Sequence, residues 1–198
     1  MAVNREPILK KCKSLGISPM VMGVGKETKR NSAAGFKRIE SDYKRQLKEK
    51  QKLKFIYGVQ EKQFRHIYER AEKLEGQAGP NLLSLLEQRL DNVVFRMGLS
   101  MTRREARQLV SHGHFDVNGS RVDIPSYRIK VGDVISLREN SKKSVKFQEI
   151  VEATNGRLIP PWLDVNKENL TASVVRLPAK EDLDYEVEEH LIVELYSK

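Results

Sequence analysis

The sequence predicts an α+β fold, in which a mainly helical first half is followed by a compact unit of helices and short antiparallel β-hairpins. Apolar residues recur at helical spacing between residues 42 and 97. A capping box starts a further helix at Thr102. Beyond that helix the apolar residues alternate strictly around Asn118-Gly119, a dipeptide typical of two-residue hairpin turns.

Charge is distributed very unevenly over the 198 residues, which carry a formal net charge of +9. Residues 1–54 hold 15 basic and 5 acidic side chains, and residues 91–150 hold 11 basic and 7 acidic ones. Residues 151–198 reverse the balance, with 5 basic and 10 acidic side chains. A basic first quarter and an acidic last quarter favour a polyanionic partner such as a nucleic acid.

The same composition excludes several classes of protein. Cys12 is the only cysteine, so the chain can form neither an intramolecular disulfide nor a multi-cysteine metal site. The N-terminus lacks an apolar segment of signal-peptide length, and no run approaches the roughly 18 apolar residues of a membrane span. We therefore expect a cytoplasmic protein with no membrane partner, no metal and no cofactor.

The first 45 residues are predicted to be an extension rather than a domain. They are rich in Lys, Gly, Ser and Asn and show little periodicity, so they bury too little apolar surface to order alone. We expect this segment to order on its partner. A solvated basic tail is the alternative.

Three helices are predicted in the part that follows. The first covers residues 42–57 and has a mostly basic outer face. The second covers roughly residues 60–76, where apolar side chains recur at i, i+3, i+4 and i+7. The third begins with an Asn81 cap, carries a stripe rich in leucine and valine, and ends at Gly98.

The next unit begins with a well-signalled helix. The Thr102 hydroxyl is expected to accept an N–H of the first turn, while the Glu105 carboxylate reaches back to the Thr102 N–H. Gly113 ends this helix, and the alternating segments that follow predict short hairpins. At the other end of the chain, the apolar run Leu191–Tyr196 must pack against another part of the chain.

Motifs that would indicate an enzyme are incomplete, so we predict no enzymatic activity and no catalytic residues. Gly23-Val24-Gly25-Lys26 resembles a phosphate-binding loop, but Met20 and Glu27 stand where glycine and a hydroxyl residue are required. Arg89-Leu90-Asp91 resembles a catalytic tripeptide of pseudouridine synthases, yet it lies within a predicted amphipathic helix. An RNA-modifying enzyme or its binding module is the competing class, and a free-standing regulator is a third.

Three arginines gather at the start of the capped helix. Arg103, Arg104 and Arg107 place three guanidinium groups at a helix end that already carries free N–H groups and partial positive charge. Bound phosphates would relieve the repulsion, because guanidinium groups bind phosphate oxygens bidentately. A solvated arginine face is the alternative. With no zinc-finger or zipper pattern, folded RNA fits better than duplex DNA.

The predicted RNA-binding side chains combine this helix, the loops after it and the basic helix near residue 50. They are Arg103, Arg104, Arg107, His112, His114, Asn118, Arg121, Arg128, Lys130, Lys44, Arg45, Lys48, Lys50, Lys52, Lys54 and Arg65. Residues 181–189, by contrast, contain six acids, which either contact basic protein neighbours or form a solvated loop.

These residues resemble a known family. Leu86-Glu87-Gln88-Arg89-Leu90-Asp91, the stretch 102–115 and Val117-Asn118-Gly119 are similar to the central module of protein four of the bacterial small ribosomal subunit. That module also occurs in pseudouridine synthases, tyrosyl-tRNA synthetases and a heat-shock protein. Matches over residues 45–52, 56–64, 172–178 and 191–194 favour the ribosomal family, in its zinc-free form.

The resemblance implies a discontinuous domain arrangement. Residues 1–45 would form a basic extension ordered on RNA, and residues 46–86 with 171–198 a helical domain. An RNA-binding module over residues 87–150 would be inserted between them, followed by a connecting loop region over residues 151–170.

The resemblance also implies a function. Members are structural constituents of the small ribosomal subunit that bind ribosomal RNA at a multi-helix junction of the 5′ domain early in assembly. They contact protein five, line with proteins three and five the channel through which messenger RNA enters, and influence decoding accuracy. Some members repress translation of their own messenger.

Overall fold

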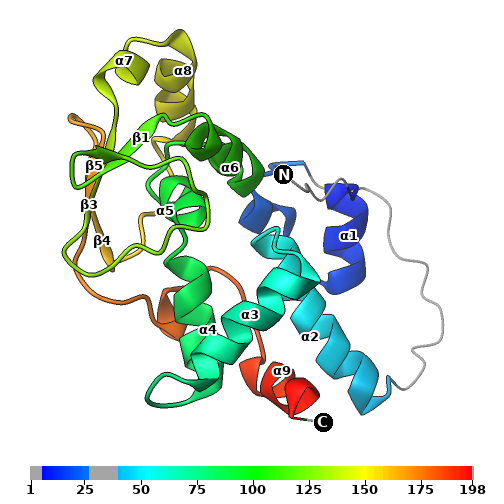
Figure 1. Ribbon diagram of the computed structural model, residues 1–198. Helices are drawn as coiled ribbons and strands as arrows, with labels where there is room; N and C mark the ends of the chain where they lie inside the picture. The colour runs from blue at the N-terminus through cyan, green and yellow to red at the C-terminus, as the bar shows by residue number, and fades with distance from the viewer. Residues whose placement is uncertain (1–5, 27–39, 198) are drawn as a thin grey trace. The chain divides into compact units, whose positions relative to one another are not determined.

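A computed structural model describes residues 6–26 and 40–197, which belong to two compact units (Figure 1). Unit 1 is formed by the chain up to Gly79 together with the segment from Asp184 onward. Unit 2 is the continuous stretch Pro80–Leu183. Across the described ranges, every helix is too short or too polar to cross a membrane.

Unit 1 is helical. Its elements are α1 (Ile8–Leu15), η1 (Pro19–Met22), α2 (Asp42–Ile56), α3 (Glu61–Glu72) and α9 (Glu189–Tyr196), and α4 (Ala78–Glu87) begins in it. The apolar C-terminus packs within this unit as expected, since Ile192 is fully buried and the Tyr196 ring stacks on Tyr68 at 4.4 Å between centroids. The Glu49 carboxylate of α2 accepts the Glu188 N–H at 3.3 Å, next to the first residue of α9.

The N-terminal segment is more ordered than the predicted extension. Residues 1–5 and 27–39 lie outside the described ranges, but α1 and η1 fall within the remainder. Cys12 and Leu15 on α1 and Val21 on η1 are buried, so this segment contributes apolar side chains to unit 1. Helix α1 packs on α2 and does not form a core alone. A few apolar residues are therefore enough to hold this segment in unit 1.

Unit 2 is mixed, which confirms the α+β class. A five-stranded antiparallel sheet has the order β2-β1-β3-β5-β4. Its strands are β1 (Phe115–Val117), β2 (Ser120–Arg121), β3 (Val134–Leu137), β4 (Leu163–Asn166) and β5 (Thr171–Val174). Its other elements are the end of α4, α5 (Leu90–Arg96), α6 (Arg103–Ser111), α7 (Glu139–Lys142), α8 (Val145–Thr154) and η2 (Lys180–Asp182).

The predicted third helix is in fact two helices. α4 ends at Glu87 and α5 begins at Leu90, with Arg89 extended between them (φ −66°, ψ 135°). The N–H groups of Leu90 and Asp91 donate to the carbonyls of Tyr127 and Pro125 at 2.9 and 3.1 Å. These bonds to a distant loop replace the intrahelical bonds that a continuous helix would make.

The structure also places the domain boundaries differently from our expectation. Strand β5 pairs with both β3 and β4, so the predicted helical segment 171–198 begins inside the sheet of unit 2. The predicted loop region 151–170 contains the end of α8 and all of β4. Both strands are four residues long and their pairing is long-range, so the local sequence gave too weak a signal.

The hairpin prediction at Asn118-Gly119 is confirmed. Val117 pairs with Ser120 across a two-residue turn, and both turn residues have positive φ, 50° at Asn118 and 77° at Gly119. The Asn118 amide donates to the Asp133 carboxylate at 2.8 Å, and its oxygen accepts the Val134 N–H at 2.9 Å. Asn118 therefore builds the turn with its side chain.

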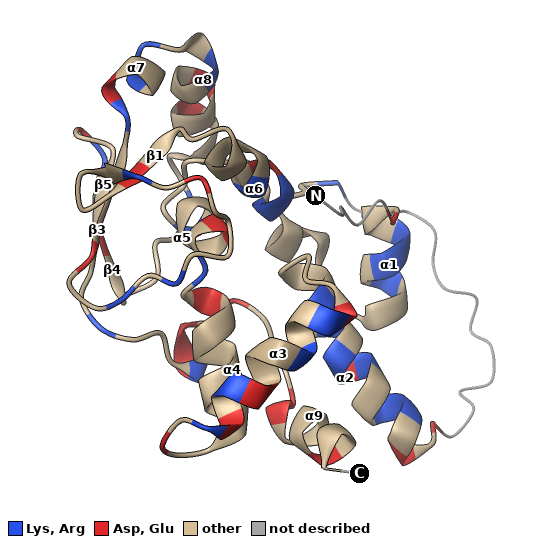
Figure 2. Cartoon of the chain, in the orientation of Figure 1, with Lys and Arg blue, Asp and Glu red and all other residues tan. Residues whose placement is uncertain are grey.

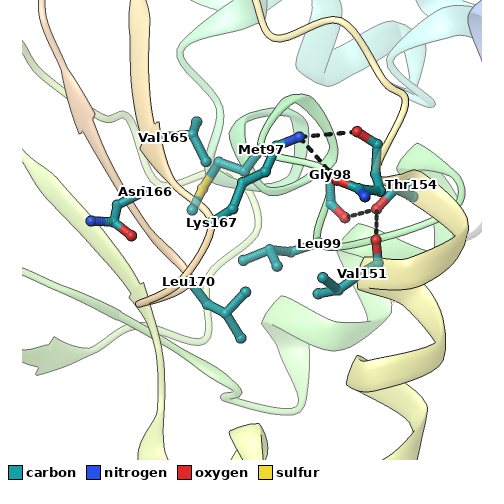
Figure 3. Close-up of a pocket in the computed structure, with 10 residues that line it drawn as sticks. Met97, Gly98, Leu99, Val151, Thr154, Val165, Asn166, Lys167 and Leu170 are labelled. Atoms are coloured by element: carbon teal, nitrogen blue, oxygen red, sulfur yellow. Dashed lines mark hydrogen bonds between the residues drawn. The ribbon is translucent and has the colours of Figure 1, made fainter.

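A hydroxyl group ties α8 to the end of α5 (Figure 3). Thr154 Oγ1 lies 2.5 Å from the Gly98 carbonyl oxygen and 2.7 Å from that of Ile150. Gly98 has φ +80°, and a Cβ there would lie 3.3 Å from Thr154 Oγ1. Glycine is thus favoured by both backbone conformation and close packing.

Gly98→Ala should therefore lower the free energy of unfolding of unit 2 by about 1–3 kcal/mol, because it combines a strained φ with a crowded Cβ. Gly156→Ala is the matched control, since no atom lies within 4 Å of the added Cβ. We expect that variant to unfold within ~0.5 kcal/mol of the wild type. Urea denaturation measures both; equal destabilisation by the two changes would contradict this account.

Candidate nucleic-acid interface

A buried polar network joins α5 to α6 in unit 2. The Glu87 carboxylate accepts Nε and Nη2 of Arg96, each at 3.0 Å, and the Asn92 amide at 2.9 Å. Asn92 Oδ1 in turn accepts Arg103 Nε at 2.8 Å. All four side chains are nearly fully buried. Because a buried charge is costly unless it is paired and hydrogen-bonded, this network fixes α6 against α5.

Arg103 consequently differs from our prediction of a phosphate-binding residue. It is 5% exposed, and its guanidinium lies 4.3 Å from the centroid of the Phe95 ring. The Arg157 guanidinium lies at the same distance from that ring and donates to the carbonyls of Phe95 and Ser100 at 2.9 and 2.8 Å. Arg103 is therefore part of the core, held by an amide and an aromatic ring.

A single carboxylate, that of Asp91, holds two arginines. Its oxygens accept Nε and Nη2 of Arg89 at 3.0 and 2.8 Å. Asp91 Oδ2 also accepts Nε and Nη2 of Arg107 at 2.9 and 2.8 Å. The Asp91 side chain is 4% exposed, whereas that of Arg107 remains 17% exposed. One negative charge thus meets two positive ones, and the group retains a positive charge at the start of α6.

The cap of α6 differs slightly from the predicted capping box. Thr102 Oγ1 accepts the Glu105 N–H at 3.1 Å, as expected. The Glu105 carboxylate, however, accepts the N–H of Met101 at 2.8 Å rather than that of Thr102. Lys146 Nζ lies 3.3 Å from the same carboxylate. On this first turn Arg104 is exposed and makes no ion pair with any residue that the structure describes.

A second group of basic residues, three of them cations and two of them histidines, surrounds the turn that ends α6. This α6 turn cluster comprises His112, His114, Arg121, Arg138 and Lys146. A Cβ at Gly113 would overlap the Arg121 guanidinium, so glycine allows that side chain to lie against the turn. Burial lowers the pKa of His114, and the charges of His112, Lys146, Arg138 and Arg121 lower it further. Like charges crowd one imidazole, which an anion would relieve.

The predicted cations of unit 1 are paired with acids. Lys44 and Lys48 lie near Glu40, Lys50 and Lys54 near Glu61, Lys52 near Glu49, Arg45 near Glu188, and Arg65 near Glu69. Burial would raise the pKa of Glu61, but hydrogen bonds and charges from its two lysines lower that pKa to about 2. Helix α2 itself is mainly basic (Figure 2), and the acids that compensate its charge lie mostly on other segments. The exposed pairs of Arg45 and Arg65 are weak, whereas the side chains of Lys50, Lys52 and Lys54 are less than a fifth exposed.

The predicted site residues thus fall into groups. Arg104 and Arg107 lie at the start of α6, and His112, His114 and Arg121 at its end. The exposed side chains of Arg128 and Lys130 follow in the loop before β3. Sequence reasoning missed Asp91, Arg138 and Lys146, and their roles depend on partners far along the chain.

In the described ranges, no three side chains of His, Cys, Asp or Glu lie together as metal ligands would. The cavity between α5, α8 and the β4–β5 turn is mainly apolar, with Met97, Leu99, Val151 and Leu170 in its lining (Figure 3). Lys167 at this cavity donates to Asn155 at 2.9 and 3.2 Å.

Two helices packed on a small antiparallel sheet, with cations at both ends of one helix, define an RNA-binding module. Residues 88–135 match the S4 domain family, and residues 4–87 match the family described as ribosomal protein S4/S9 N-terminal domain.

The relatives agree with both matches. The chain is 52% identical to small ribosomal subunit protein uS4 of Lachnospira eligens over 198 residues, the full length of both. It is 50% identical to the uS4 of Agathobacter rectalis over the full length of both. With the uS4 of Clostridioides difficile it shares 59% over 174 residues, 86% of this chain and 84% of that one.

The chain belongs to the uS4 family of the bacterial small ribosomal subunit. It is a structural, non-enzymatic component of the ribosome that binds ribosomal RNA within the small subunit.

Affinity for this RNA should rise as the pH falls from 7.5 to 5.5. The pKa of His114 is lowered in the free protein, and nearby phosphates would raise it again. The complex would then hold more protons than the free protein, so acid favours the complex. The dissociation constant, measured at constant ionic strength, tests this. His112→Gln/His114→Gln should flatten the profile, whereas His66→Gln in unit 1 should not; a flat wild-type profile would count against it.

Proposed function

We propose that the exposed cations at both ends of α6 hold the phosphates of a multi-helix junction in the 5′ domain of small-subunit ribosomal RNA. The observation that supports this proposal is that some arginines of unit 2 are buried and others are exposed. Arg96 and Arg103 are held in the core, whereas Arg104 and Arg121 are exposed. An excess of exposed positive charge at both ends of one helix suits a polyanion whose phosphates are spread over a folded surface.

The full proposed surface extends this group to Arg107, His112, His114, Arg128 and Lys130. In unit 1 the cations near residue 50, with Arg65, would exchange their acidic partners for phosphates. For Arg45 and Arg65 such an exchange costs little, because exposed ion pairs contribute roughly 0–1 kcal/mol, whereas Lys50 and Lys54 would have to leave closer and less exposed contacts with Glu61. Arg103 and Asn118 would act indirectly, by fixing α6 and the hairpin turn.

We further propose that binding at this junction nucleates assembly of the small subunit. Resemblance to the family supports this, as it supports contacts with ribosomal proteins five and three, a place beside the channel through which messenger RNA enters, and an influence on decoding accuracy. Repression of the protein's own messenger would use the same RNA-binding surface.

The acidic segment 181–189 offers a surface for basic protein neighbours. Asp182 is bound to Arg176 by two hydrogen bonds of 2.7 and 2.6 Å, so it is committed within unit 2. Glu181 in unit 2 and Glu186 in unit 1 are exposed. Their charge favours contact with a basic protein over contact with RNA.

Arg104→Ala/Arg121→Ala should weaken binding to a junction fragment of the ribosomal RNA by roughly tenfold or more, because two charge-assisted contacts are lost. The slope of the logarithm of the binding constant against the logarithm of the salt concentration should become shallower by about 0.7–0.9 for each lost phosphate contact. Arg70→Ala, on the exposed face of α3, is the control. Filter binding at several salt concentrations and co-sedimentation with the small subunit provide the measurements; unchanged affinity and slope in the double variant would refute the proposed surface.

A further inference from the structure

We propose that Asp91 is a positioning residue of the RNA interface, which raises affinity for RNA although its own charge is negative. Its carboxylate would orient Arg107 before the RNA arrives, and the nearly buried Arg89 would hold that carboxylate from the other side. This inference rests on the proposed function of the α6 surface. It concerns an acidic residue in the middle of a basic site, where charge alone predicts the opposite effect.

The geometry around Asp91 favours orientation over simple neutralisation. Arg89 precedes α5 and Arg107 lies on α6, so the carboxylate connects two segments 18 residues apart. Arg89 contacts both carboxylate oxygens through Nε and Nη2, and Arg107 presents the same two atoms to the single oxygen Oδ2. This contact restrains the Arg107 guanidinium along its Nε–Nη2 edge and leaves its Nη1 on the opposite side from the carboxylate.

Such restraint should strengthen phosphate binding. A long arginine side chain loses rotamer freedom when it binds a phosphate, and prior restraint reduces that loss. Arg107 keeps a partly exposed side chain while Asp91 is almost completely buried. RNA would therefore meet the arginine, and the carboxylate behind it would stay out of contact.

A purely structural role for Asp91 makes a different prediction. α6 is held on α5 independently of Asp91 by the hydrogen bond between Asn92 and Arg103, and the Asn92 amide is itself held by the Glu87 carboxylate. Loss of the Asp91 charge should therefore leave α6 in place. If Asp91 only fastened the two helices, its replacement would lower stability without changing the salt dependence of binding by the folded protein.

The test compares Asp91→Asn with Asp164→Asn in the full-length chain. Asp164 is exposed on β4 of the same unit, so both variants gain the same charge. At temperatures where both are folded, Asp91→Asn should bind the junction RNA roughly tenfold more weakly than Asp164→Asn. The slope of its log binding constant against log salt concentration should become shallower by about 0.7–0.9, the value expected for the loss of one phosphate contact. Equal or tighter binding by Asp91→Asn would overturn the proposal.

Two further variants keep the test decisive. Asp91→Glu keeps the charge but moves the carboxylate by one methylene, so it should also weaken binding; wild-type affinity would overturn the proposal even if Asp91→Asn fails to fold. In an Arg107→Ala background, Asp91→Asn should cost no additional affinity, and a persisting tenfold loss would show that Asp91 does not act through Arg107.

The outcome is separable from that of the proposed function. If Arg104→Ala/Arg121→Ala binds RNA normally, the proposed surface itself is wrong. If that double variant is weakened and Asp91→Asn is not, the surface stands and the inference about Asp91 fails.

Discussion

The requirement that a buried arginine find acceptors inside the protein governs the architecture of unit 2. Arg96 and Arg103 are nearly fully buried, and oxygens of Glu87 and Asn92 accept N–H groups from them. Because Asn92 belongs to α5 and Arg103 to α6, their hydrogen bond helps to fix where α6 lies. The position of α6 then decides which cations face outward. The buried arginine network therefore contributes to the fold of unit 2 and also to the arrangement of the proposed RNA-binding surface.

The acids nearest α6 are engaged within unit 2, Glu87 by Arg96, Asp91 by two arginines and Glu105 by Lys146. Arg138 is likewise paired with Asp116, so among the described residues the uncompensated charge at α6 comes mainly from Arg104 and Arg121. At the turn that ends α6, burial lowers the pKa of His114, and the like charges around it lower that pKa further. An anionic partner would relieve this repulsion, and we propose that ribosomal RNA is that partner. Unit 1 differs, because the lysines of its basic helix pair with Glu49 on the same helix and with Glu61 on α3.

Sequence reasoning reached the fold class, the Asn118-Gly119 hairpin and the start of α6, since each depends on residues close together in the chain. It missed the break before Leu90, because the competing hydrogen bonds come from residues 125–127. It treated Arg103 as a surface residue, because an arginine at a helix start does not reveal that Asn92, 11 residues earlier, accepts its Nε. Burial of a charged side chain depends on partners that periodicity cannot locate.

The most direct test of this account is a high-resolution structure of the chain bound to small-subunit ribosomal RNA. The account predicts that Arg104, Arg107 and Arg121 lie within hydrogen-bonding distance of phosphate oxygens. Arg96 should remain on Glu87 and Arg103 on Asn92, as in the free protein. Phosphates bound by Arg96 or Arg103, with Arg104 and Arg121 turned to solvent, would contradict it.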